Sequence, residues 1–174
     1  ANITFFLISG TLLGCIRERK MLQHDKDIDI GIWQDQKVRE LIETIRCSGY
    51  FYILPSSSDD ILVVRHVNGV TIDIFSHYDE KGNYFHAGGK CRWRNTPFTL
   101  APHKFLDDQY LIPENYSLYL TENYGSWEIP NKEFDSALDT PNMEVTNIDK
   151  MLIYLYKRLS KKPDIQPSLR IRLE

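Results

Sequence analysis

Three carboxylates stand at alternate positions near the start of the chain, at Asp25, Asp27 and Asp29. Ile28 and Ile30 alternate with them, and a period of two is typical of a β-strand with one polar and one apolar face. Asp27 and Asp29 are therefore expected on the same side of a strand. Carboxylates that close repel one another unless a cation lies between them, and acidic oxygens suit Mg²⁺ or Mn²⁺. The spacing predicts a divalent-metal site.

An EF-hand loop and a solvated edge strand are the alternatives to this metal site. An EF-hand loop is excluded, because with Asp25 as its first ligand Ile30 stands where that loop needs Gly and Gln36 where it needs Glu. A solvated edge strand that carries acids remains open, since short acidic patterns also occur without a metal. The sequences before and after the three acids are needed to distinguish an edge strand from a metal site.

The preceding segment reads as a buried strand over residues 2–8 that runs into Ser9, Gly10 and Thr11. A turn of this kind leads into a helix, where backbone N–H groups and the Thr11 hydroxyl can face a phosphate. Further along, Asp73 interrupts the apolar strand over residues 70–75. A carboxylate in such a strand is costly to bury unless it is paired or bound to a metal, so Asp73 is the expected third ligand, with an exposed edge strand as the alternative.

Taken in order, these segments resemble the nucleotidyltransferase superfamily and, more closely, its LicD family of phosphocholine and polyol-phosphate transferases, which includes fukutin and fukutin-related protein. The resemblance covers roughly residues 3 to 130 and rests on three blocks in the same order. One block departs from the family, which usually carries Pro-Trp where this chain has Gln23-His24. The three blocks read SGTLLGCIRERKMLQHDKDIDIGI, TIDIFSHY and FLDDQYLIPENYSLYLTENYGSWEIP.

The resemblance implies a site and a reaction. Asp27, Asp29 and Asp73 would hold two Mg²⁺ or Mn²⁺ ions, and Ser9 to Thr11 would hold the donor phosphates. Asp25 would be a further ligand or would orient Thr11 or a metal-bound water. The implied donor is CDP-choline, CDP-glycerol or CDP-ribitol. The implied acceptor is a hydroxyl of a surface glycan such as capsule or lipopolysaccharide, and CMP leaves. Nucleotidyl transfer with release of pyrophosphate and an inactive binding or scaffold domain are the alternatives.

Three arginines are candidates for contacts to the donor. Arg17 follows the turn where the family has an arginine, and its guanidinium could bind a phosphate through two hydrogen bonds. Arg92 and Arg94 share one face of an extended segment and could bind a diphosphate or an acceptor phosphate. A solvated surface position is the alternative for all three arginines. His77, His86 and His103 are assigned no role.

Composition is consistent with a domain that needs no disulfides. The chain has 174 residues, 42% of them hydrophobic, and three cysteines at irregular spacing that suit free thiols. The longest uncharged apolar run, residues 5–16, is too short to span a bilayer and has no basic segment before it. A cytoplasmic protein is therefore expected, with an anchor upstream of Ala1 left open.

Charge is distributed unevenly along the chain. Residues 1–147 hold 14 Lys/Arg and 21 Asp/Glu, whereas residues 148–174 hold seven and three. The basic tail, with its Lys157-Arg158 and Lys161-Lys162 pairs, could contact an anionic membrane surface or could be an ordinary solvated helix end. No basic face interleaved with aromatic residues is present in the main body, which argues against nucleic acid as a partner.

The pattern of elements predicts an α+β fold with a mixed, nucleotidyltransferase-like sheet flanked by helices. Helices are expected over residues 36–47, 113–124 and 148–159, and strands over 50–54, 61–67, 70–78 and 84–87. Asn68-Gly69 is a strong hairpin signal between two of these strands. A catalytic domain over residues 1–147 followed by a C-terminal helix and tail over 148–174 is the expected organisation.

Overall fold

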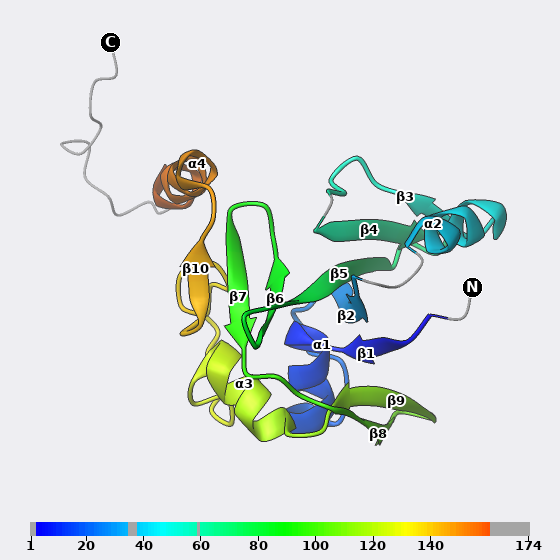
Figure 1. Cartoon of the computed structure of the whole chain (residues 1–174), viewed down its shortest axis with the longest axis horizontal. Helices are drawn as coiled ribbons and strands as arrows, with labels where there is room; N and C mark the ends of the chain where they lie inside the picture. The colour runs from blue at the N-terminus through cyan, green and yellow to red at the C-terminus, as the bar shows by residue number, and fades with distance from the viewer. Residues whose placement is uncertain (1–2, 35–37, 59, 161–174) are drawn as a thin grey trace, which may run out of the picture.

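Two parallel strands, β2 (Asp27–Trp33) and β5 (Thr71–Glu80), form the centre of the sheet (Figure 1). The computed structural model describes residues 3–34, 38–58 and 60–160. The isoleucines that alternate with the acids lie on one face of these strands, where Ile32 and Ile74 pack in a cluster with Ile45 of helix α2 (Val38–Cys47). The predicted alternation is therefore correct, and it leaves the acidic positions on the opposite face.

A hairpin extends the sheet beyond β5. Strand β4 (Ile61–His66) pairs antiparallel with β5 through the turn at Asn68 and Gly69, as the sequence predicts, and β3 (Phe51–Ile53) pairs with β4. The backbone N–H of His66 donates to the carbonyl of Val70 over 2.8 Å and closes this turn. Gly69 has a φ of +99°, which glycine adopts at little cost.

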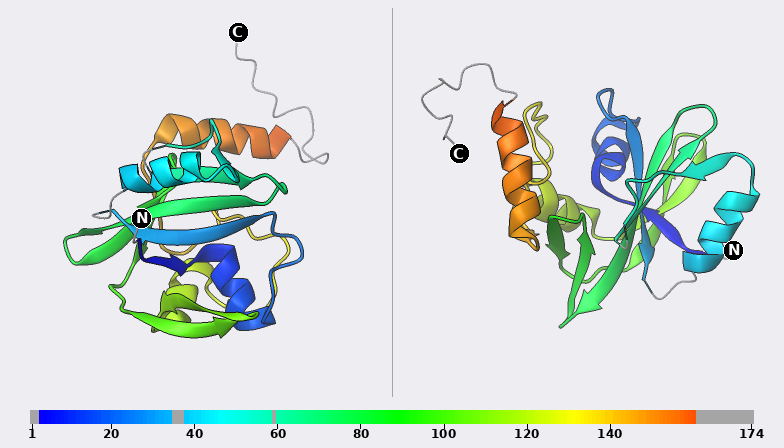
Figure 2. Two further views of the ribbon diagram at one scale, coloured as in Figure 1. Left: turned by 90° about the vertical axis from the view of Figure 1, so that its right-hand side faces the viewer. Right: turned by 90° about the horizontal axis from the view of Figure 1, so that it is seen from above.

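The ten-residue strand β5 joins this part of the sheet to a second branch. Its residues Thr71–His77 pair with β2, and Thr71–Phe75 also pair with β4, whereas its last three residues pair with β6 (Asn83–Ala87). Strands β7 (Cys91–Asn95) and β10 (Met143–Val145) follow β6 in order. Figure 1 shows the two branches diverging from β5. Helix α4 (Ile148–Ser160) and helix α2 lie at opposite ends of the molecule (Figure 2).

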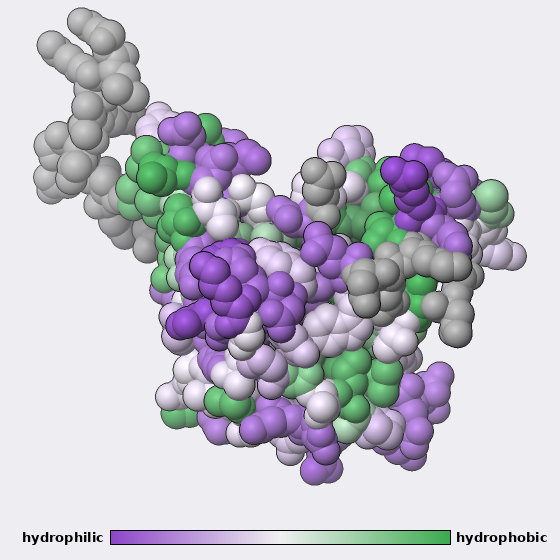
Figure 3. Space-filling model, in the orientation of Figure 1, coloured by the Kyte–Doolittle hydropathy of each residue, from purple (hydrophilic) through white to green (hydrophobic). Residues whose placement is uncertain are grey.

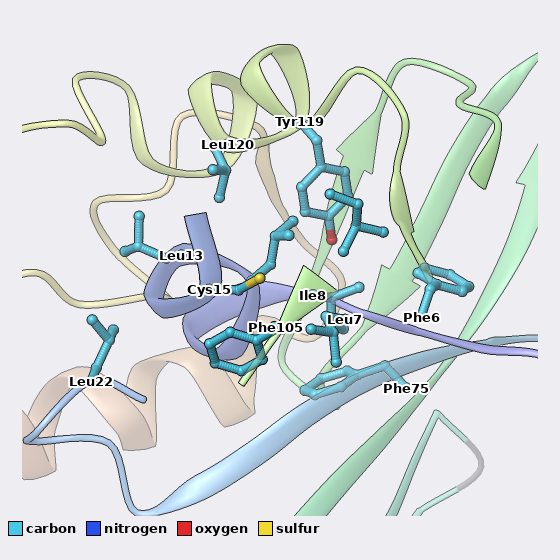
Figure 4. Close-up of a cluster of buried hydrophobic side chains, with 12 residues drawn as sticks. Phe6, Leu7, Ile8, Leu13, Cys15, Leu22, Phe75, Phe105, Tyr119 and Leu120 are labelled. Atoms are coloured by element: carbon cyan, nitrogen blue, oxygen red, sulfur yellow. The ribbon is translucent and has the colours of Figure 1, made fainter. Parts of the chain in front are cut away.

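The largest hydrophobic core lies on the acidic side of the sheet, around β1 (Phe5–Leu7) (Figure 4). Strand β1 runs antiparallel to β2 and parallel to β9 (Asp108–Pro113), and β8 (Leu100–Phe105) forms the edge. Helix α1 (Ser9–Leu13), the π-helical segment η1 (Gly14–Glu18) and helix α3 (Tyr116–Tyr124) cover this face. Leu12 of α1 and Leu120 of α3 are fully buried in the core.

The sequence-based elements agree with the structure except in the second half of the chain. The α+β fold with a mixed sheet is confirmed, and α2, α3 and α4 follow the predicted helices closely, although positions 36 and 37 of the first prediction lie outside the described residues. Strands β8, β9 and β10 were not predicted, because their polar and proline-containing sequences lack the β-branched alternation of β2 and β5. All three cysteines are free thiols, as expected. Within the described ranges, each helix is too short or too polar to span a bilayer.

Candidate active site

Strand β2 and the loop before it bring three carboxylates together. One oxygen from each of Asp25, Asp27 and Asp29 lies within 4.8 Å of the other two. Asp27 and Asp29 project from the same face of β2 because they are two residues apart. The predicted proximity of these two acids is therefore present, and Asp25, whose role the sequence left open, belongs to the same group.

Asp73 lies on the neighbouring strand directly beside Asp29. The two residues are partners in the parallel register of β2 and β5, so their side chains project from the same face. Asp73 lines the same cavity as the other three acids, and burial followed by the charge of Asp27 raises its pKa. Asp73 is not part of the group of Asp25, Asp27 and Asp29, whose oxygens lie within 4.8 Å of one another, so it lies at the edge of that group.

Burial and repulsion between neighbouring charges raise the pKa values of Asp25, Asp29 and Asp73. Burial raises the pKa of Asp29 well above its ordinary value, and the charges of the three other acids raise it further. The pKa of Asp25 rises to about 6 through burial and then through its hydrogen bond with Asp27, and that of Asp73 rises to about 6 through burial. Since oxygen ligands and surplus negative charge are what Mg²⁺ and Mn²⁺ require, these residues fit such an ion.

The Ser9 to Thr11 turn holds Asp29 in place. The backbone N–H of Gly10 donates to Oδ2 of Asp29 over 3.1 Å, and the backbone N–H of Asp29 donates to Oγ1 of Thr11 over 2.8 Å. Thr11 is 2% exposed and does not line the cavity, so the structure does not place its hydroxyl where a phosphate was expected. The hydroxyl instead fixes the backbone of β2 at an acidic residue 18 positions away.

Gly10 leaves the space that the cluster occupies. A Cβ atom at this position would lie 2.2 Å from Oδ2 of Asp25 and 3.4 Å from Oδ2 of Asp29. Any larger residue would therefore push Asp25 out of the group. Ser9, at the start of α1, has a φ of +46° and lines the cavity beside Gly10. The close approach of Asp25 explains why glycine stands between Ser9 and Thr11 in this turn.

A cavity of about 790 Å³ extends from the acidic cluster to the loop after α3. Arg17 lines it and is well placed for an anion, although its Nε donates to Glu18 and its Nη1 to the backbone carbonyl of Trp127, both over 3.0 Å. Lys20 and Lys132 also line it, and neither was predicted from the sequence because a lone surface lysine carries no pattern. The cavity thus joins an acidic end to basic groups that suit phosphates.

Aromatic rings form the wall of the cavity on the side of the second sheet branch. His86 of β6 stacks on Trp93 of β7 with ring centroids 5.0 Å apart, and Phe75 of β5 packs against both. Burial lowers the pKa of His86 well below its ordinary value, and burial lowers that of His77 to about 4, so both rings are neutral near pH 7. A neutral aromatic wall suits the flat face of a sugar or a base.

Arg92 and Arg94 do not line the cavity, so the structure does not bring them together with the other predicted site residues, and their contact with the donor stays a prediction. They alternate with Trp93 along β7 and project from the opposite face of the strand. Arg92 pairs with Glu80 over 2.7 Å and with Glu144 over 2.8 Å, and Arg94 lies 3.7 Å from Glu144. These arginines join β5, β7 and β10.

Another arginine lies beside the cluster on the acidic face of the sheet. Asp27 and Arg65 are both register partners of Thr71, so the three side chains form a row across β2, β5 and β4. The Nε of Arg65 donates to Oγ1 of Thr71 over 3.2 Å, and Arg65 is exposed. Arg65 is not among the residues that line the cavity.

Comparison with known proteins finds relatives among ribitol-5-phosphate transferases. Ribitol-5-phosphate transferase FKTN of Mus musculus is 29% identical over 159 residues, and the human protein of the same name is 28% identical. Each match covers 84% of this chain and 34% of the relative, so the chain spans about a third of the length of these relatives. An uncharacterized protein of Rickettsia typhi is 25% identical, with 73% of this chain and 41% of that protein covered.

A solved structure and a family profile complete the comparison. The crystal structure of the lincosamide antibiotic adenylyltransferase LnuA with bound lincomycin superimposes with a TM-score of 0.46 and 17% sequence identity, over 68% of this chain and 74% of that one. Residues 2–113 match the profile described as "LicD/FKTN/FKRP, nucleotidyltransferase domain". That segment contains all four clustered aspartates and the turn that holds Asp29. The chain therefore belongs to the LicD/FKTN/FKRP family.

Proposed function

We propose that this domain transfers a polyol-phosphate or phosphocholine group from a CDP-activated donor to a hydroxyl of a glycan. The observation that carries the proposal is the meeting of four carboxylates from the β2 and β5 region with Arg17, Lys20 and Lys132 around one cavity. An acidic end suits divalent ions and a basic side suits phosphates, as phosphoryl transfer requires. The ribitol-5-phosphate transferases among its relatives make CDP-ribitol the first donor to test.

The acids have distinct parts in this proposal. Asp25, Asp27 and Asp29 would hold Mg²⁺ or Mn²⁺, which supplies charge neutralisation of the diphosphate and a lower pKa of the attacking hydroxyl when bound. Asp73 lies at the edge of this group and accepts the proton of the acceptor hydroxyl. The acceptor oxygen then forms the new bond to the phosphorus that bears the head group, and the bond to the CMP oxygen breaks.

The basic side of the cavity serves the leaving group. Negative charge builds on the CMP oxygens as their bond to the transferred phosphorus breaks. Arg17 is held by Glu18 and by the carbonyl of Trp127, so its remaining N–H groups face this charge from a fixed position. Lys20 and Lys132 line the same cavity and add positive charge. The aromatic wall at Trp93 receives the acceptor sugar or the donor base.

Identification of the released product tests the proposal. The protein is incubated with Mg²⁺ and with CDP-ribitol, CDP-glycerol or CDP-choline in turn, and mass spectrometry follows the nucleotide and the glycan. Release of CMP together with a glycan heavier by one head-group phosphate supports the proposal, and Asp29→Asn should abolish both signals. Pyrophosphate released from a nucleoside triphosphate would show nucleotidyl transfer instead. No turnover of any donor or triphosphate would favour a binding domain.

A further inference from the structure

Helix α4 presents a row of hydrophobic side chains to solvent. Figure 3 shows this apolar surface over α4. Residues three or four positions apart on a helix share a face, so most of these side chains form one stripe along the axis. Each is more than half exposed: Ile148 71%, Leu152 57%, Ile153 54%, Tyr156 69% and Leu159 53%.

The opposite face of α4 is fixed to the domain. Met151 is buried against Cys91 and Ala137, and the hydroxyl of Tyr154 donates to the buried carboxylate of Asp135 over 2.6 Å. Arg158 pairs with the same carboxylate over 2.6 Å. These contacts hold the helix in one orientation, so the apolar stripe is a fixed outer surface of the folded domain.

The charge around the stripe selects a negatively charged partner. Lys150 and Lys157 are exposed on α4, and the acidic residue within α4 is Asp149 in its first turn. In the sequence, residues 148–174 carry seven Lys/Arg against three Asp/Glu, whereas residues 1–147 carry a surplus of acids. An anionic surface would attract the α4 end of the molecule and repel the remainder, which directs the stripe toward that surface.

The size of the stripe argues against a protein partner. A helix of 13 residues is about 20 Å long and its exposed stripe is about 10 Å wide, which gives an area of about 200 Å². Stable protein interfaces bury about 800 Å² on each partner. Two copies of α4 placed face to face would also bring Lys150 and Lys157 of each copy together. An apolar stripe with basic residues at its side is typical of helices that lie in a membrane interface.

We propose that α4 binds the surface of an anionic membrane and lies parallel to it, with Leu152 and Tyr156 inserted among the lipids. In this orientation Lys150 and Lys157 contact the lipid head groups. Membrane binding determines where the domain is held and is independent of the reaction proposed for the acidic cluster. The stripe adds an apolar contribution to the charge of the tail, so binding should need both apolar insertion and anionic lipid.

Cosedimentation with vesicles tests this inference. We expect the full chain to bind vesicles of phosphatidylcholine mixed with phosphatidylserine, and to bind pure phosphatidylcholine only weakly. The double variant Leu152→Gln with Tyr156→Gln should bind about tenfold less, because it removes the largest inserted side chains. Lys150→Glu with Lys157→Glu should remove the preference for phosphatidylserine. Val67→Gln with Val70→Gln is the matched control, since these residues are exposed apolar side chains at the distant β4–β5 hairpin.

Two results would overturn the inference. One is binding of the Leu152→Gln, Tyr156→Gln protein at the wild-type level while its thermal midpoint is unchanged. The other is a concentration-dependent dimer in size-exclusion chromatography that the same double variant abolishes, which would make the stripe an interface between two copies. Vesicle binding by α4 is measured without any substrate. Failure of the transferase assay would therefore not affect the membrane proposal, and failure to bind vesicles would not affect the proposed transferase activity.

Discussion

Replacing Asp73 by Asn should stabilise the metal-free protein at neutral pH. Asp73 is half-buried beside Asp29, and burial followed by the charge of Asp27 raises its pKa from 3.8 to about 6. Asn has nearly the same shape and no charge, so the variant removes the repulsion and retains the packing. A residue that served only to stabilise the fold would give the opposite sign when it is replaced.

The magnitude follows from the size of the pKa shift. A group whose pKa is higher in the folded protein binds more protons there, so stability falls as pH rises from about 4 through about 6 and stays low above that. The shift from 3.8 to about 6 corresponds to at most about 3 kcal/mol, and solvent screening of this half-exposed side chain reduces it to about 1 kcal/mol. The variant should therefore gain about 1 kcal/mol at pH 8 and nothing near pH 4.

Thermal unfolding with and without Mn²⁺ measures this effect. Without metal, a gain of about 1 kcal/mol should raise the midpoint at pH 8 by about 2 to 4 °C. With Mn²⁺ the order should reverse, because the charge of Asp73 beside the three acids that would hold the ion strengthens binding to the wild type, which is then stabilised more. Asp107→Asn, an exposed acid in the turn between β8 and β9, should change neither midpoint. An Asp73→Asn protein that is less stable than wild type at pH 8 without metal would refute the reasoning.

Three further substitutions separate the parts of the site. Thr11→Val removes the acceptor of the Asp29 backbone N–H, so turnover should fall at least about tenfold while Thr11→Ser keeps it, as steady-state kinetics would show. Arg17→Lys keeps the charge and loses the planar guanidinium, and its kcat/KM for the donor should fall by about 1 to 3 kcal/mol of transition-state binding; unchanged kinetics would remove Arg17 from the site. Arg92→Ala breaks two ion pairs outside the cavity, so it should lower thermal stability by about 1 kcal/mol and leave kcat unchanged.

Local patterns in the sequence were enough to find the acids. Alternation of Asp with Ile identifies both the strand and its polar face, because successive side chains of a strand point to opposite faces. Asp73 was found the same way, as a charge inside an apolar strand. The family blocks supplied the order of these segments. The register that sets Asp73 beside Asp29 could not be predicted, since strand pairing depends on the whole sheet.

The sequence could not show the contacts of residues whose partners are distant in the chain. Arg92 was expected to bind phosphate, but its partner Glu144 is 52 positions away on β10, a strand that no local pattern predicts. Thr11 was expected to face a phosphate, but its hydroxyl accepts the backbone N–H of Asp29. The sequence could not show this contact because Asp29 lies 18 positions away on strand β2. In both cases the residue type indicated a hydrogen-bonding group correctly, and only the tertiary contact decided what it binds.

The folded domain extends beyond residues 2–113, the segment that matches the family profile. Tyr119 and Leu120 of α3 are buried in the main core, and residues from the end of α3 and the loop after it, between Asn123 and Thr140, form one side of the cavity. A gene truncated at residue 113 would encode the four aspartates but would lack the helix that covers the main core, and its product should aggregate. A recombinant between family members should therefore keep α3 together with the strands that it packs against.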